Sequence, residues 1–430
     1  HPPVKGVPGA QSSGAYLVSF NAEAFCSYGQ GVAGKGLNAP VSQRAAFAYT
    51  TALNALLRYD SRHRLQLGDT SVLIWATNDT QDDELAADLL QHGDEARDPP
   101  DSDAPDSDTP GELESGVRDR ARAVMKAIRE GRAPTDVLGD LDPTQRFYVL
   151  GLDAPSQARL TVRFWLETTF GAFLERIKQH RDDLMLETRF SNEPHLPALW
   201  KLAAETAPER KIDNALPQIK TGLLHAVLSG APYPRAVLGA VLGRIRVESG
   251  QASRAKRGDP VNHPRAALIK AVLRRQARLQ KESIPKEIDA MSLDTETPDI
   301  PYRLGRLFAV MEKAQQEALG RNLNRTIRDG YFATASAAPR AVFPRLLRLT
   351  QHHISKAEYG DQSDKRIAAV LDALTPETAF PPTLTLEEQG RFVLGYYHQR
   401  NATQQEIEAR KSAKTAKDSE TAPSDEKEQA

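Results

Sequence analysis

The segment from Arg244 to Lys281 is rich in basic residues, and its only acidic residues are Glu248 and Asp259. Lysine and arginine side chains release condensed counterions when they meet a phosphate backbone, so this segment is suited to binding nucleic acid. The predicted contacts are Arg244, Arg246, Arg254, Lys256, Arg257, Arg265, Lys270, Arg274, Arg275 and Arg278. The alternative is an ordinary charged helix face, which the scarcity of acidic neighbours makes the weaker interpretation.

A second basic set lies nearer the carboxyl end of the chain. Arg321, Arg325 and Arg328 are spaced so that they share one helical face, and Arg345 and Arg348 stand one turn apart. Such a row of arginines suits contact with a strand backbone, as in the grip on a displaced single strand. No aromatic platform accompanies these arginines in the sequence, so base stacking is not expected to dominate there.

Small polar residues near the amino end form a third candidate site. The turn at residues 9–14 (GAQSSG) would bring the side chains Gln11, Ser12 and Ser13 close to a duplex, and glutamine and asparagine can read base edges. A plain polar turn is the alternative interpretation. The candidate contacts that flank this turn are Lys5, Asn21 and Lys35.

Lys35 stands in a glycine-containing run, GQGVAGKG, but no serine or threonine follows it. A flexible loop that contacts a DNA phosphate is therefore favoured over a nucleotide-binding loop. No GxSxG motif and no carboxylate cluster typical of a two-metal nuclease is present. His352 and His353 are adjacent, so on a helix they point about 100° apart and cannot easily share a metal ion. We expect neither a catalytic site nor a cofactor.

Composition limits the class of protein. The chain has 430 residues, a net charge of -1, 40% hydrophobic and 26% charged residues, which are typical of two or three globular domains. Cys26 is the only cysteine, which excludes an internal disulfide framework and favours a reducing compartment such as the cytoplasm. No apolar run approaches the roughly 20 residues that cross a bilayer, so no membrane partner is expected.

Residue periodicity predicts an α+β fold. The first domain, residues 1–167, mixes helices and strands, with Ser42 as the N-cap of its first clear helix. Gly68-Asp69 predicts a hairpin turn between two strands. The predicted strands are Ala15–Phe20, Arg64–Leu67, Ser71–Ala76, Tyr148–Leu152 and Leu160–Leu166.

From residue 168 onward the pattern is helical. We expect a helical domain at 168–284, a linker at 285–300, a helical bundle at 301–401 and a disordered charged tail at 402–430. The bundle helices are predicted at Tyr302–Leu319, through Ile327, and at Phe343–Ala357, Lys365–Leu374 and Leu386–Gln399.

Residues 92–115 are rich in Asp, Pro and Ser and nearly free of apolar side chains, which predicts a disordered acidic insertion. The plain interpretation is a solvated insertion. A sharper alternative is a nucleic-acid mimic that shields the basic face.

Several motifs, in order along nearly the whole chain, resemble the large subunit of the type I-C CRISPR Cascade complex, a Csd-type family. They include GAQSSGAYLVSFN at 9–21, LNAPV at 37–41, AAFAYTTALN at 45–54, ARLTVRFW at 158–165 and LGYYHQR at 394–400. The resemblance implies a non-catalytic subunit that supports protospacer-adjacent motif recognition, duplex opening, displaced-strand stabilisation and helicase-nuclease recruitment. Guide pairing would then read the target sequence.

The resemblance also implies the partners: CRISPR RNA, target double-stranded DNA with its displaced strand, the Cascade backbone and small subunits, and the CRISPR helicase-nuclease. Members of the family begin with a further amino-terminal stretch that this chain lacks, so part of the motif-reading machinery is expected to be missing. The carboxyl-terminal bundle is expected to act like a Cascade small subunit and to be made separately as well, with Met291 as the candidate start. A purely structural assembly subunit and an unrecognised metal-dependent nuclease are the alternative functions.

Overall fold

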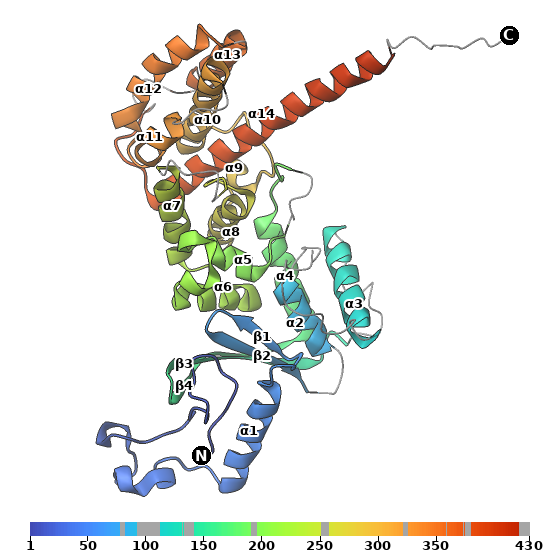
Figure 1. Ribbon diagram of the computed structural model, residues 1–430, viewed down its shortest axis with the longest axis vertical. Helices are drawn as coiled ribbons and strands as arrows, with labels where there is room; N and C mark the ends of the chain where they lie inside the picture. The colour runs from blue at the N-terminus through green and yellow to red at the C-terminus, as the bar shows by residue number, and fades with distance from the viewer. Residues whose placement is uncertain are drawn as a thin grey trace, which may run out of the picture. The chain divides into compact units, whose positions relative to one another are not determined.

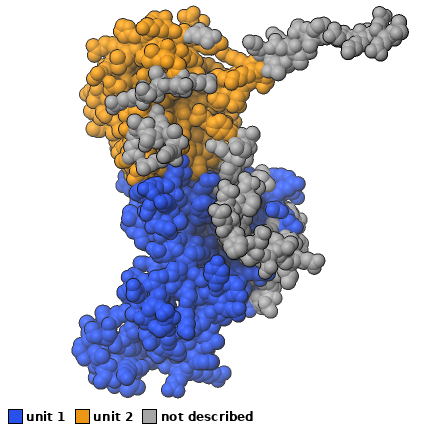
Figure 2. All heavy atoms as spheres, in the orientation of Figure 1, with its two compact units in different colours: residues 1–183, 196–237 blue, residues 184–195, 238–430 orange. Residues whose placement is uncertain are grey.

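The computed structural model describes residues 1–77, 82–92, 112–130, 132, 142–190, 196–250, 258–320, 326–357, 359–372, 374 and 380–420. It divides into two compact units (Figure 2): unit 1 comprises residues 1–183 and 196–237, and unit 2 comprises residues 184–195 and 238–430. The fold is α+β, as predicted, with the described strands in unit 1.

Unit 1 contains a four-stranded antiparallel sheet in the order β1-β2-β3-β4. The strands are β1 (Arg64–Leu67), β2 (Thr70–Ala76), β3 (Arg146–Ser156) and β4 (Arg159–Thr169). Gly68 adopts a positive φ of 60° in the predicted turn between β1 and β2, a conformation that glycine reaches without steric cost. The two predicted antiparallel pairs, β1 with β2 and β3 with β4, are both confirmed.

Each face of the sheet is covered by a different set of segments (Figure 1). On one face, Leu73, Leu150 and Leu152 pack with residues of the amino-terminal segment and of α1 (Gln43–Leu56). On the other face, Phe147 contacts Phe173 of α4 (Phe170–Leu184) at 5.2 Å between ring centroids. Among its described residues, this unit also contains the α-helices α2 (Asp82–His92), α3 (Glu112–Arg129), α5 (Leu199–Ala204) and α6 (Pro217–Ser229).

Local sequence signals explain how this unit begins. The Ser42 side chain accepts a hydrogen bond from the backbone nitrogen of Ala45 at 3.1 Å, which confirms the predicted N-cap of α1. The predicted strand Ala15–Phe20 is wrong, because only isolated bridges form there, Val4 with Ala15 and Tyr16 with Arg159. The segment lies at the edge of β4 and pairs for too few residues to become a fifth strand.

Unit 2 is helical, and α7 (Arg235–Ser249) belongs to it from Leu238 onward. Its helices follow the predicted apolar stripes closely. They are α8 (His263–Leu279), α9 (Lys286–Asp289), α10 (Ile300–Leu319), α11 (Ile327–Ala335), α12 (Pro339–Ile354), α13 (Gly360–Leu371) and α14 (Leu386–Glu420). The Asp299 side chain caps α10, and Thr326 with Asp329 forms a capping box on α11.

Helices α10 and α14 cross at two glycines. A Cβ atom on Gly305 would lie 1.9 Å from the Phe392 carbonyl oxygen, and one on Gly395 would lie 2.0 Å from that of Tyr302. Only glycine allows this approach, because any side chain would collide with backbone atoms. Phe308 packs edge-on against Phe392 beside the crossing, at 6.2 Å between ring centroids.

Two expectations about the chain's organisation need correction. Residues 402–420 are helical and continue α14, because the Ala-, Glu- and Lys-rich sequence has high helix propensity and Glu406 pairs with Arg366 of α13. The expected linker at 285–300 contains α9 and lies within unit 2. Residues 93–111 and 421–430 lie outside the described residues, and with them most of the acidic insertion and the end of the tail.

In the part of the chain that the structure describes, no helix combines the length and the apolarity that a bilayer crossing requires.

We expect Gly395→Ala to destabilise unit 2 by about 1–3 kcal/mol, because the added methyl group would force α10 and α14 apart. The measurement is the thermal unfolding midpoint by circular dichroism. Gly239→Ala is the matched control, since it lies on α7 with open space around its Cβ position. Equal midpoints for the two variants would contradict the close crossing.

Candidate nucleic-acid interface

The basic residues of α8 do not form the exposed face that the sequence predicts. Arg265, Lys270 and Arg275 are each 1% exposed or less. Arg265 donates to both carboxylate oxygens of Glu248, at 2.6 and 3.0 Å, and to the carbonyl oxygen of Pro260 at 3.0 Å. A buried arginine requires such a bidentate partner to offset its desolvation.

Lys270 is held mainly by backbone rather than by an acidic side chain. Its ammonium group donates to the carbonyl oxygens of Met185, Asp289 and Ala290. Counting acidic neighbours along the sequence cannot detect partners of this kind. The expectation that Arg265, Lys270 and Arg275 face solvent is therefore wrong, and Arg265 and Lys270 join α8 to neighbouring segments.

The other residues of this segment are less enclosed. Arg244 and Arg246 are half-buried on α7, with Arg244 Nε 3.3 Å from Glu248, and Arg274 Nε lies 2.8 Å from the Asp289 carboxylate. Arg278 is half-buried near the end of α8. The predicted contacts Arg254, Lys256 and Arg257 lie outside the described residues.

Asp259, whose side chain is 24% exposed, is the centre of a partly buried ion cluster in unit 2. Three arginines converge on its carboxylate: Arg400 at 2.8 Å, Arg328 at 2.9 Å and Arg189 at 3.1 Å. Glu312 is the second acid of the cluster, and it accepts a hydrogen bond of 2.5 Å from the Tyr396 hydroxyl. Arg328, predicted to share an exposed face with Arg321 and Arg325, is thus buried, which corrects that expectation. Arg321 and Arg325 lie outside the described residues.

Electrostatics fix the protonation of this cluster. Burial alone would raise the pKa of the Asp259 carboxyl, but the three arginine charges outweigh burial and hold that pKa well below its ordinary value. Burial would lower the pKa of Arg328, yet the Tyr396 hydroxyl and the two carboxylates raise it. The ion pairs therefore stay charged across the physiological pH range.

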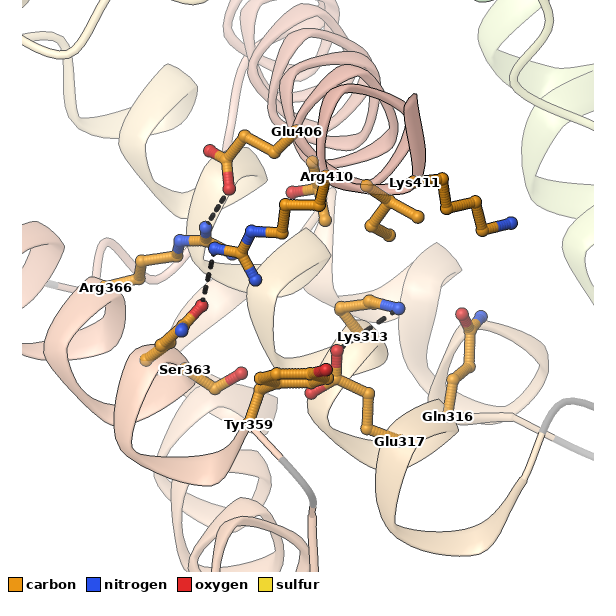
Figure 3. A pocket seen from close by; sticks show the side chains of 12 residues that line it. Lys313, Gln316, Glu317, Tyr359, Ser363, Arg366, Glu406, Arg410 and Lys411 are labelled. Carbon is orange, nitrogen blue, oxygen red and sulfur yellow. Dashed lines mark hydrogen bonds and ion pairs between the residues drawn. The ribbon is translucent and has the colours of Figure 1, made fainter. Parts of the chain in front are cut away.

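Beside this cluster the surface of unit 2 is hollowed into a groove, which we call the α10–α14 groove. Its outer hollow, of about 390 Å³, lies between α10, α13 and α14 (Figure 3). Its inner hollow, of about 230 Å³, is lined by Arg189 and Arg400 of the ion cluster. Lys313, Gln316, Thr403 and Ile407 line both hollows, which makes the groove continuous.

Positive charge predominates in the α10–α14 groove. Three acidic side chains line it, Glu312, Glu317 and Glu406. Six basic side chains line it: Arg189, Lys313, Arg366, Arg400, Arg410 and Lys411. The surplus of cations attracts a polyanion.

The partners of Arg366 and Arg410 leave these two cations exchangeable. Arg366 pairs with the half-exposed Glu406, and the Arg410 guanidinium donates to Gln362 at 3.0 Å. Arg410 also lies over the Tyr359 ring, 5.8 Å from its centroid, and Figure 3 shows Lys411 pointing away from the other labelled side chains. Exposed ion pairs contribute little stability, so a phosphate can take the place of a carboxylate here.

The expectation of a disordered tail at 402–430 conceals the part of this groove that the second half of α14 contributes. The signal was present: Thr403, Glu406, Ile407 and Arg410 are spaced three or four apart and therefore share one helical face. Arg345 and Arg348 of α12, by contrast, are exposed and lie outside the groove lining. The Arg345 guanidinium lies 5.6 Å from the Tyr331 ring centroid.

In unit 1 all six predicted contacts are exposed. The backbone of Gln11 donates to the carbonyl oxygen of Gln157 at 2.9 Å, which holds the turn with Ser12 and Ser13 beside the β3–β4 turn. Lys5 lies on the same segment, which the Val4–Ala15 bridge closes.

Arg159 is a positioning residue that the sequence did not reveal. Its guanidinium donates to the Asn21 side chain and lies 4.9 Å from the centroid of the exposed Phe25 ring. It therefore ties the loop that carries Asn21 to the start of β4. Lys35 has a positive φ of 45°, a strained conformation for a non-glycine residue, which is frequent in functional loops.

The described residues contain no group of three or more His, Cys, Asp or Glu side chains that could hold a metal ion.

A comparison with protein-family models gives one decisive match. The model of the CRISPR-associated protein family Cas_Csd1 matches residues 1–404. The chain belongs to this family. It is thus a CRISPR-associated protein of the Cascade type, which agrees with the resemblance of its motifs to a Csd-type large subunit. A search of curated proteins found no similar chain.

We expect Asp259→Ala to destabilise unit 2 of this Cas_Csd1 protein by about 3–5 kcal/mol, because it leaves three arginines without their shared carboxylate. Urea unfolding followed by circular dichroism measures the loss. Asp364→Ala, which removes an exposed carboxylate from α13, serves as the control and should unfold like the wild type. A similar midpoint for both variants would show that the cluster does not hold the unit together.

We also expect the stability of unit 2 to fall on mild acidification. Burial, with a further contribution from Lys270, lowers the pKa of His398 to about 3, whereas the unfolded chain binds this proton near pH 6.5. The unfolded state therefore binds more protons between these values, and the free energy of unfolding should fall by about 2 kcal/mol from pH 7.5 to pH 5.

The variant His398→Gln isolates this effect, since it keeps a polar group near the Tyr302 hydroxyl, which lies 2.7 Å from His398 Nδ1 in the native chain. Urea unfolding of both proteins at a series of pH values is the measurement. Parallel pH profiles for wild type and variant would disprove the role of His398.

Proposed function

We propose that this Cas_Csd1 chain is a non-catalytic DNA-binding large subunit of a type I-C CRISPR surveillance complex. In this role it supports protospacer-adjacent motif recognition, opening of the duplex, stabilisation of the displaced strand and recruitment of the helicase-nuclease. Its partners would be the CRISPR RNA, the target DNA, the Cascade backbone and small subunits, and the helicase-nuclease. The observation that carries the proposal is the surplus of basic side chains in the α10–α14 groove.

The groove suits a single strand better than a duplex. Its basic residues come from α10, α13, α14 and the segment after α4, and they line two joined hollows rather than a broad convex face. A flexible strand can follow such a path with its phosphates near Arg366 and Arg410, while the Tyr359 ring, which is half-exposed, offers a surface for a base. The displaced strand of a target is the natural occupant of this kind of groove.

The contacts in unit 1 would serve the duplex. Gln11, Ser12 and Ser13 present short polar groups on a turn, and Lys35 adds a cation on an exposed loop. Glutamine can hydrogen-bond to base edges, whereas lysine contacts phosphate. We therefore assign motif-proximal contacts to this loop region and strand contacts to the groove.

Assembly is a second role that one specific observation favours. Arg265, Lys270 and Arg275 are buried and serve packing within unit 2 rather than a ligand. In a purely structural subunit, the groove arginines would likewise pair with acidic groups of another subunit.

We expect replacement of Arg366, Arg410 and Lys411 by Gln to flatten the salt dependence of single-strand binding. Each lost phosphate contact lowers the slope of log affinity against log salt by about 0.7, so the triple variant should lose up to about 2. Fluorescence anisotropy with a labelled oligonucleotide, measured on the full chain across salt concentrations, gives the slope.

The matched control replaces the exposed cations of α12, Arg340, Arg345 and Arg348, by Gln. It should leave the slope close to that of the wild type. A flattened slope in the control alone would place the strand on α12. Normal binding by the groove variant together with failed complex assembly would support the structural role, and cleavage of DNA by the purified chain with Mg²⁺ or Mn²⁺ would overturn the non-catalytic assignment.

A further inference from the structure

Three aromatic side chains meet on one face of the sheet in unit 1. Trp75 of β2, Tyr148 of β3 and Trp165 of β4 have ring centroids 5.5 to 5.7 Å apart in every pair, so they form a triangle. Tyr148 is stacked with both tryptophans, at interplanar angles of 28° and 27°. We call this set the aromatic triangle.

The register of β2, β3 and β4 places the three rings of the aromatic triangle side by side on one face of the sheet. Trp75 is paired with Tyr148, and Trp165 is paired with Leu150, two residues further along β3, so all three side chains lie on the same face. Farther along this face, Leu73, Leu150 and Leu152 are covered by the amino-terminal segment. Trp75 packs at the margin of that cover, and Trp165 is 53% exposed.

A cation lies beside the three rings. Arg146 lies two residues before Tyr148 on β3 and therefore on the same face of the sheet. Its guanidinium pairs with Glu167 at 3.3 Å, and both side chains are about half exposed or more. Such a pair is weak enough for a phosphate to compete with the carboxylate.

We infer that the aromatic triangle stacks unpaired bases of a nucleic-acid strand, with Arg146 beside it for the adjoining phosphate. The inference rests on the proposed function and adds a second strand site, in unit 1. The chemistry favours a base over an apolar protein segment, because all three groups are flat π-systems and a cation lies next to them. Aromatic side chains on adjacent strands of an antiparallel sheet stack bases in the same manner in RNA-recognition motifs.

The test compares Trp165→Leu, which keeps an apolar side chain but loses the π-face, with Trp165→Phe, which keeps an aromatic ring. The full-length chain is titrated with labelled oligothymidylate and with an abasic oligomer of the same length. We expect Trp165→Leu to bind oligothymidylate about tenfold more weakly, with an unchanged salt slope and unchanged binding of the abasic oligomer. Trp165→Phe should retain most of the affinity.

The matched control is Trp200→Leu, an exposed tryptophan of α5 in the same unit that is not part of the triangle. It should bind both oligomers like the wild type, and thermal midpoints confirm that each variant is folded. Wild-type affinity of Trp165→Leu for oligothymidylate would overturn the inference, and so would an equal loss for the abasic oligomer. The salt slope separates this site from the groove, because only the groove variant should change it.

Discussion

The carboxylate of Asp259 holds three arginines that come from distant parts of the chain, and the arrangement of unit 2 depends on it. Arg189 follows α4, Arg328 begins α11 and Arg400 lies in the middle of α14. Three closely spaced guanidinium groups without an acid would repel one another where solvent screens them only partly. Asp259 and Glu312 together leave the cluster with one surplus positive charge at the inner end of the groove, so the same ions that stabilise the unit also give its surface a positive potential.

The basic residues of this chain thus divide by burial into two groups with different roles. Arg265 and Lys270 of α8 are enclosed and bind a carboxylate or backbone carbonyl groups, whereas Arg366 of α13 and Arg410 and Lys411 of α14 line a groove. A net charge of -1 conceals this division. In the proposed DNA-binding role the division would be useful, because cations fixed in the core cannot trap nucleic acid nonspecifically, and those at the surface can be placed along a strand.

Much of the fold could be predicted from the sequence, because local signals decide it. The Gly68-Asp69 turn, the Ser42 cap and the apolar stripes of α10 to α14 each act within a few residues. The candidate site was less predictable, because its residues contact groups that are distant in the sequence. Lys270 donates to the backbone carbonyl oxygen of Asp289, and Arg328 pairs with Asp259. Trp75, Tyr148 and Trp165 were assigned to strands, but only the strand register shows that their rings meet.

Met291, the candidate start of a shorter polypeptide, lies between α9 and α10, so such a polypeptide would divide the ion cluster. A polypeptide translated from Met291 would contain Arg328 and Arg400 but lack both Asp259 and Arg189. Glu312 would be left to neutralise two guanidinium groups, and the missing counter-anion would have to come from another molecule.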